Sequence, residues 1–564
     1  MLRGGVLLAP WAGHFVLTRW LALIGVAVTF TLLDAVKPLH VDDTYYYFHA
    51  RQAASHPFDP HGFMVFWHER PEPASNRVAP PVLPYWLAPF VRAFPEGPYV
   101  WKLSLLPFAV AFVGALFALL RRFASGLEWP LLLLTVASPA VLPSFNLMLD
   151  IPAVGLGMLA LVLFMRSGEA FGDLRFGPRR RWAAGALWAS GAGLLAGLSA
   201  QTKYTGLLVP AVLLAHALVY RRLRVWLVAT AVAVTVFVGW ELFTAIRYSE
   251  SHFVRHVFRR AEPLDSKLPL VIAFCSVLGG AAPGLASFGL LARGAHARAT
   301  AFGIGATLLG FVLLALLPGP DPEAAATVIL GMLGAALVAS LLWASRRLWS
   351  EDPGAEARAS RFLVLWLAIE AVGHLGLSPF PAVRRVLGLV VVATLVIGRV
   401  ASRACRGQRR RLAWKAAAAG ASLGALFWTV DFLEASAEKR AVLDTVSWLH
   451  QRAGPTFERV FFAGHWGFQF YAERAGMRPV VAGRFAGATP LHAGDWLVVP
   501  SPHVDQQRIR LESAALQAVH DLRISDPLPL TTLPGFYTGE TPLHRLTGPR
   551  VEVTVYRVKR DFLP

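Results

Sequence analysis

Long apolar stretches recur along most of this chain, and they constrain its fold more than any other feature of the sequence. A helix needs about 20 predominantly apolar residues to cross the roughly 30 Å hydrocarbon core of a bilayer. We therefore expect a mainly α, polytopic helical membrane protein with about thirteen transmembrane helices. The apolar windows cover residues 17–36, 99–120, 131–148, 150–166, 183–201, 204–220, 225–246, 268–291, 299–317, 323–344, 361–377, 385–400 and 415–430.

Basic residues cluster between alternate windows, as at Arg121–Arg122, Arg179–Arg181 and Arg409–Arg411. Because cytoplasmic loops carry an excess of Lys and Arg, this pattern predicts a multi-pass protein of the inner (plasma) membrane with a cytoplasmic N terminus. The first window is expected to be retained as a span rather than removed as a signal peptide. The formal charge of +19 is then largely a topology signal, and we expect no nucleic acid among the partners.

The apolar blocks stop near residue 430, which divides the chain into two expected domains. Residues 1–430 form a membrane domain, and residues 431–564 form a small α/β domain that an odd number of spans places outside the cytoplasm. In the second domain "ERVFFAG", "DWLVVPS" and "VEVTVYRV" predict strands, and "AVLDTVSWLHQRAG" predicts an amphipathic helix ending at Gly454. No GxxxxGK[ST] phosphate loop occurs, which argues against ATP-driven transport.

The first extracytoplasmic loop, at about residues 37–98, is long, rich in proline and aromatic residues, and shows no clear helix. Loops of this length are commonly functional. It begins with "VDDTYYYFHARQ", in which Asp42 and Asp43 follow the first span. The two acids are either a solvated helix end or a catalytic pair, and the tyrosines that follow are able to bond a carboxylate or stack on a sugar.

Other ionisable residues lie at the same predicted membrane face, where charge is costly and tends to mark function. Asp150 stands between two windows, and Lys203 lies in "GLSAQTKYTGLLVP". Arg384 and Arg385 precede the twelfth window, and His252 lies in "RYSESHFVRHVFRR". Structural alternatives are a helix cap for Asp150, a lysine that reaches to the interface, and an amphipathic helix for the His252 segment. The arginine pair suits a lipid phosphate, whose oxygens match the guanidinium fork.

Together these residues resemble the polyprenyl-phosphate-sugar-dependent GT-C glycosyltransferases, of the family 39 and 83 types. This group includes the protein O-mannosyltransferases and the bacterial lipid A aminoarabinose transferase. The shared features are the acid pair with its aromatic continuation, the "LD-x-P" junction at Asp150, the "TKYTGL" element at Lys203 and the closing soluble domain. The usual acid pair of the family is Asp-Glu, whereas this chain has Asp42-Asp43.

The resemblance implies an inverting transfer of a sugar from a polyprenyl-phosphate donor to a lipid, glycan or protein acceptor. Asp42 would be the general base, with Asp43 beside it as an orienting or acceptor-binding group. The resemblance assigns the remaining site residues to two tasks: the acceptor cavity to Asp150, Tyr45, Tyr46 and His252, and the donor phosphate to Lys203, Tyr204, Arg384 and Arg385. Some relatives bind a metal through a first-loop Glu and a later His. Glu69 or Glu72 with His252 would be such a set here, and a divalent metal is left open.

Two other functions remain as alternatives. One is a secondary transporter or lipid flippase, although this chain shows no repeated halves. The other is a polymerase or ligase that uses undecaprenyl-diphosphate oligosaccharides. In the C-terminal domain, His465, Trp466 and Gln469 lie in a predicted strand-to-helix turn that either binds acceptor or is structural.

Overall fold

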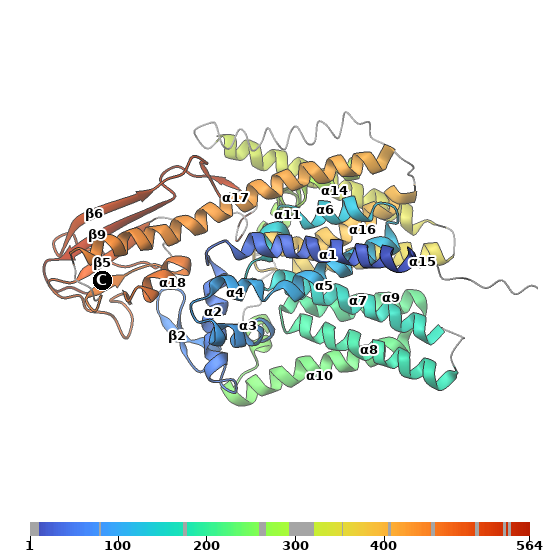
Figure 1. Ribbon diagram of the computed structural model, residues 1–564, viewed down its shortest axis with the longest axis horizontal. Coiled ribbons are helices and arrows are strands. Elements are labelled where there is room, and N and C mark those ends of the chain that lie inside the picture. The colour runs from blue at the N-terminus through green and yellow to red at the C-terminus, as the bar shows by residue number, and fades with distance from the viewer. Residues whose placement is uncertain are drawn as a thin grey trace, which may run out of the picture.

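The computed structural model shows a helical bundle joined to a smaller sheet domain by one long helix (Figure 1). Helix α17 (Gln408–His450) runs from the bundle into the sheet domain, and the first loop lies where the two meet. The structure describes residues 11–77, 80–172, 177–258, 267–292, 321–351, 354–403, 408–452, 457–501, 507–533, 537, 539 and 543–564.

Within these described residues, nine helices are long and apolar enough to cross a membrane. A bent pair, α11 (Leu268–Ala281) and α12 (Pro283–Ala292), makes a tenth candidate if its two arms, bent by 88°, are one span. The nine candidates confirm a multi-pass helical membrane protein. They comprise α1 (Trp11–Ala35), α4–α5 (Pro98–Leu103 and Leu106–Phe123), α7 (Asp150–Gly172), α8 (Pro178–Ala200), α10 (Leu223–Tyr248), α14 (Asp321–Trp349), α15 (Ala355–Leu377), α16 (Leu387–Arg403) and α17.

The expected number of about thirteen spans is not confirmed. The window 131–148 forms only two short pieces, α6 (Glu128–Val136) and η2 (Leu142–Phe145), separated by the Ser138-Pro139 sequence. Proline lacks the backbone N–H that a continuing helix requires. The window 204–220 forms the short η3 (Tyr204–Leu207) and α9 (Leu208–Tyr220). The window 299–317 lies outside the described residues.

The expectation that the first loop has no clear helix is wrong. Helix α2 (Asp42–Ser55) begins directly at the acid pair, and α3 (Val82–Ala93) follows a short hairpin, β1 (Met64–Phe66) with β2 (Pro71–Pro73), and the turn η1 (Ala74–Asn76). Prolines obscured α3 in the sequence: Pro80, Pro81 and Pro84 fall before or within its first turn, where no backbone N–H is needed, whereas Pro89 lies inside the helix. The loop is therefore a packed layer, with α2 against α3 and α18 (Trp466–Arg474).

The C-terminal domain is an α/β module, as expected. Its five-stranded sheet has the order β4-β3-β5-β9-β6, in which β3 pairs in parallel with β4 and β5, and β9 pairs antiparallel with β5 and β6. A separate two-stranded ribbon joins β7 and β8. The strands are β3 (Val460–Phe462), β4 (Arg478–Pro479), β5 (Trp496–Ser501), β6 (Leu516–Ile524), β7 (Leu530–Thr531), β8 (His544–Arg545) and β9 (Val551–Val558).

The three segments predicted as strands are β3, β5 and β9, and β9 alternates between buried and half-buried residues as its sequence predicts. The predicted amphipathic helix is the last part of α17, which ends at His450, while Gly454 lies outside the described residues. The expected domain division at residue 430 falls inside α17, whose C-terminal half packs on β6 and β9.

Candidate active site

Five charged residues from separate segments converge at one end of the bundle, and we call them the mouth cluster: Asp42, Asp150, Lys203, Arg384 and Arg385. Arg384 pairs with Asp42 at 2.8 Å and lies 4.0 Å from Asp150. Lys203 donates to Asp150 at 2.5 Å. The sequence named all five, and the structure brings them together.

Each member of the mouth cluster lies at the start of a helix or in a short turn between helices. Asp42 and Asp150 are the first residues of α2 and α7, where a helix N-terminus favours negative charge. Lys203 is extended in the turn between α8 and η3. Arg384 and Arg385 lie in the one-turn helix η6 (Val383–Val386) that leads into α16. The side chain of Asp42 keeps 25% exposure, whereas that of Asp150 keeps 4%.

A cavity opens beside the mouth cluster, between α7, α9, α15 and α16. Asp150, Lys203, Arg384 and Arg385 line it at one end. The rest of its wall is mostly apolar, with residues such as Met158, Leu161, Val212, Trp366 and Val391. Glu370 and His374 of α15 also line it, and sequence analysis missed both. A charged mouth above an apolar chamber suits an amphiphile with an anionic head.

Positive charge is in excess at the mouth, with three cations against two carboxylates. Burial lowers the pKa of Lys203, Asp150 opposes this effect, and Arg385 and Arg384 add to the lowering. The Arg385 guanidinium packs 4.1 Å from the centre of the Phe380 ring and faces no acid at ion-pair distance among the described residues. An anion entering the mouth would therefore meet positive charge that the two carboxylates do not fully balance.

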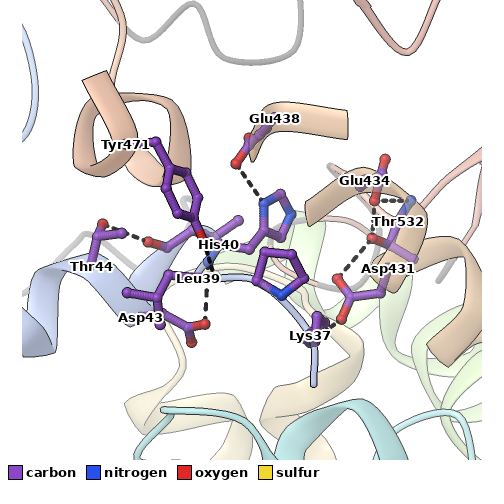
Figure 2. Close-up of polar contacts among 12 residues, drawn as sticks. Lys37, Leu39, His40, Asp43, Thr44, Asp431, Glu434, Glu438, Tyr471 and Thr532 are labelled. Carbon is purple, nitrogen blue, oxygen red and sulfur yellow. Dashed lines mark hydrogen bonds and ion pairs between the residues drawn. The ribbon is translucent and has the colours of Figure 1, made fainter. Parts of the chain in front are cut away.

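Asp43 faces away from the mouth, although it is the neighbour of Asp42. It is fully buried, pairs with Lys102 at 3.2 Å and accepts a hydrogen bond from the His40 backbone N–H at 3.2 Å. Successive helix residues point about 100° apart, so one acid of the pair reaches the cavity side and the other reaches the interior. Figure 2 shows Asp43 beside Leu39 and His40.

Two of the three tyrosines after the acid pair, Tyr45 and Tyr46, are buried. Burial, followed by the charge of Asp42, raises the pKa of Tyr46, which lies one helical turn after Asp42 in α2. Tyr45 packs against Trp67, with ring centroids 5.2 Å apart, and against His49. Tyr45 thus serves as part of the packing between α2 and the hairpin of the first loop.

His252 belongs to a different cluster. Its ring lies 4.4 Å from that of His61, whose Nδ1 is 3.3 Å from Nδ1 of His49. Burial lowers the pKa of His252 to about 4 and that of His49 to about 3, so these imidazoles are neutral near pH 7. Neutral imidazoles are the form that binds metals.

The first-loop glutamates do not join His252. Glu69 pairs with Arg484 of the C-terminal domain, and Glu72 pairs with Arg77. The structure therefore offers no Glu–His ligand set of the kind the resemblance implied among the described residues.

Tyr204 lies beside Lys203 in sequence but points elsewhere. Its hydroxyl donates to Glu241 at 3.3 Å, and the same carboxylate accepts from the Ser251 hydroxyl at 2.7 Å and the Phe253 backbone N–H at 3.0 Å. Glu241 thereby ties the Lys203 turn to the segment after α10. Sequence reasoning missed Glu241, although it is the only acid in the apolar window 225–246.

A second set of charged residues lies where the bundle meets the C-terminal domain, and we call it the junction network: Lys37, His40, Asp43, Lys102, Asp431, Glu434 and Glu438. Figure 2 labels all of these residues other than Lys102. Lys37 pairs with Asp431, and His40 Nδ1 lies 2.9 Å from Glu438. Burial alone would lower the pKa of His40, but Glu438 raises it to about 9. The Thr532 backbone N–H donates to Glu434 at 3.0 Å.

Ligand atoms of His40, Asp431 and Glu434 lie within 4.8 Å of one another, which is a spacing that could hold a metal ion. Lys37, however, already bonds Asp431, and Arg550 approaches Glu434 at 3.6 Å. These side chains supply the positive charge that a metal would bring. The junction network is therefore held together by ion pairs within the protein.

The predicted strand-to-helix turn in the C-terminal domain is confirmed between β3 and α18. His465 is buried and donates from Nε2 to the His68 carbonyl at 2.6 Å, while its Nδ1 lies 3.0 Å from Gln469 Oε1. Gly464 and Trp466 adopt positive φ angles of 98° and 60°. These contacts join the turn to the first loop.

No family model and no curated protein matches this chain. Among solved structures it is similar to ArnT from Cupriavidus metallidurans in the apo state, with 16% identity, a TM-score of 0.37, and coverage of 86% of this chain and 93% of that chain. It is also similar to the apo oligosaccharyltransferase of Archaeoglobus fulgidus, with 14% identity, a TM-score of 0.47, and coverage of 82% and 64%.

A further match is archaeal AglB from Archaeoglobus fulgidus in complex with an inhibitory peptide and a dolichol-phosphate, with 14% identity, a TM-score of 0.45, and coverage of 84% and 65%. The chain thus spans just under two thirds of the two Archaeoglobus chains. These three matches share at most 16% identity with this chain. At TM-scores below 0.5 they assign no activity, substrate or partner to this chain.

Proposed function

We propose that this protein is an inverting membrane glycosyltransferase that moves a sugar from a polyprenyl-phosphate donor to an extracytoplasmic lipid, glycan or protein acceptor. The observation that carries the proposal is the mouth cluster itself. Asp42, a quarter exposed, pairs with Arg384, and Arg384 lines the charged end of an otherwise apolar cavity together with Lys203 and Arg385. A lipid-linked sugar phosphate has three parts that match these features. Its sugar would react beside the carboxylate, its phosphate would meet the cations, and its apolar tail would enter the cavity.

Asp42 is the proposed general base. It is the more exposed of the two adjacent acids, and Arg384 holds one of its oxygens at 2.8 Å. In the reaction an acceptor hydroxyl or amine attacks the anomeric carbon as its proton passes to Asp42. The bond between that carbon and the phosphate oxygen breaks, and the anomeric centre inverts. General-base catalysis of this kind contributes about 10²- to 10⁴-fold in rate.

Lys203, Arg384 and Arg385 are the proposed binding groups for the donor phosphate. All three line the cavity mouth, and charge develops on the phosphate as it leaves. Asp150 keeps Lys203 in place through their 2.5 Å contact. The apolar wall beyond Glu370 would receive the polyprenyl chain. We assign the mouth cluster to the extracytoplasmic side because the arginine-rich loops lie at the opposite ends of the same helices.

Purified full-length protein in liposomes tests this proposal. The vesicles would carry a polyprenyl-phosphate pentose, hexose or amino sugar, with cell-envelope lipids and glycans as acceptors, and mass spectrometry would report the transferred sugar. We expect transfer from a lipid-linked donor, none from the matching nucleotide sugar, and none in vesicles with Asp42→Asn.

A fluorescent analogue of the donor lipid, added to the same vesicles, separates transfer from translocation. Sugar transfer without movement of the lipid between leaflets supports the glycosyltransferase. Movement of the lipid without transfer would instead establish the flippase alternative and contradict the proposal.

A further inference from the structure

Tyr537 of the C-terminal domain reaches into the region of the mouth cluster. It follows β7 in the chain, and its side chain is almost fully buried. Its hydroxyl donates to Asp431 of α17 at 3.0 Å, and its ring meets the His40 ring edge-on at 5.8 Å. The same ring also contacts Arg384, whose guanidinium carbon lies 5.4 Å from the ring centre. Tyr537 therefore bridges the junction network and the mouth cluster.

Arg384 has two acids within reach, and its choice between them matters for the proposed reaction. The same guanidinium nitrogen lies 2.8 Å from Asp42 and 4.0 Å from Asp150. Asp150 already has Lys203 as a partner, whereas Arg384 is the one basic group paired with Asp42 among the described residues. A shift of little more than 1 Å would move Arg384 from the proposed base to Asp150.

The Tyr537 ring limits that shift. A guanidinium over an aromatic face is attracted by about 0.5–1 kcal/mol at exposed sites and by about 2 kcal/mol when desolvated. The ring also removes water from one side of the ion pair, which strengthens the Arg384–Asp42 attraction. Because the hydroxyl is fixed to Asp431, the ring has a defined place relative to α17.

We infer that Tyr537 is a positioning residue that holds Arg384 against Asp42, so that the C-terminal domain completes the active site of the membrane domain. The inference rests on the proposed function of Asp42 and Arg384. It also gives the soluble domain a part in catalysis that does not depend on acceptor binding.

Two substitutions in the full-length protein separate the ring from the hydroxyl. Tyr537→Phe keeps the aromatic face under Arg384, and Tyr537→Leu removes it. Tyr556→Leu, on β9, is the control for loss of a tyrosine elsewhere in the same domain. We expect turnover within about twofold of wild type for Tyr537→Phe and Tyr556→Leu, and a fall of about tenfold for Tyr537→Leu, on the order of one buried cation–π contact.

A cryo-EM map of each variant reads the position of Arg384 without any assay of transfer. We expect Arg384 paired with Asp42 in wild type and Tyr537→Phe, and turned toward Asp150 in Tyr537→Leu. The inference is overturned if Arg384 stays on Asp42 in Tyr537→Leu, or if the Phe and Leu variants lose turnover equally. If wild-type protein transfers no sugar, the proposed function fails, while the maps still decide where Tyr537 holds Arg384.

Discussion

The mouth cluster and the junction network are both dense in charge, yet their surroundings differ. In the junction network Lys37, His40, Asp43 and Asp431 have almost no exposed surface, and each has an oppositely charged partner. In the mouth cluster Asp42 and Lys203 keep about a quarter and a fifth of their side chains exposed, and Lys203 lines the cavity together with Arg384, the partner of Asp42. One set is closed by the protein itself, and the other is open to a ligand.

This difference teaches that charge at membrane depth has two uses, and that exposure to a cavity tells them apart. Buried ion pairs fix one domain against another, since breaking such a pair leaves an uncompensated charge. Charges that face a cavity retain the ability to meet a substrate. Asp42 and Asp43 show both uses within two consecutive residues.

The largest effect on stability is expected from removing the central cation of the junction network. Lys37→Met leaves Asp431 and the nearby Asp34, 3.4 Å from Lys37, without their shared partner. We expect the free energy of unfolding to fall by about 3–5 kcal/mol. Denaturant unfolding of the purified protein in detergent checks this value. A loss as small as that of an exposed ion pair would erase the contrast between the two regions.

The pH dependence of stability sharpens the same contrast at His40. Its pKa is raised from 6.5 to about 9, so its pairing with Glu438 stabilises the fold fully below about pH 6.5. That contribution is lost as the pH rises through 9, and the change amounts to at most about 3 kcal/mol. Unfolding measured from pH 6 to pH 10 should show this decline in wild type but not in His40→Phe. Equal declines in both would place the titrating group elsewhere.

A smaller change in free energy is expected at Lys203, and in binding rather than stability. Lys203→Ala removes one charged contact to the donor phosphate, for which about 1.5–3 kcal/mol is typical. The KM for the lipid-linked donor should rise about 10- to 100-fold, whereas the unfolding temperature should change little because Arg384 remains near Asp150. An unchanged donor KM would support the alternative in which Lys203 only reaches to the membrane interface.

Much of the fold and of the mouth cluster could be predicted because apolar length and rare ionisable residues are local properties of a sequence. Lys203, Asp150 and the arginine pair stand out against apolar neighbours, and β3, β5 and β9 have clear patterns. Helix breaks near Pro139 and the helices of the first loop were missed. Packing decides whether a proline ends a helix, and α3 continues through Pro89.

Tertiary contacts decided the rest of the site. Nothing in "VDD" distinguishes Asp42 from Asp43, because their difference comes from Arg384 and Lys102, which lie far away in the sequence. Tyr537 is separated from Asp42 by most of the length of the chain, and it lies in no recognisable sequence motif. Tyr204 was grouped with Lys203 on sequence proximity, but Glu241 draws its hydroxyl to another partner.

The most direct test compares Asp42→Asn with Asp43→Asn, measuring sugar transfer per folded molecule together with the unfolding temperature. We predict that Asp42→Asn loses transfer by about 10²-fold or more at an unchanged unfolding temperature. Asp43→Asn should unfold at a lower temperature and retain transfer in the molecules that remain folded. Wild-type transfer by Asp42→Asn, or loss of transfer by a stably folded Asp43→Asn, would contradict the assignment of Asp42 as the base.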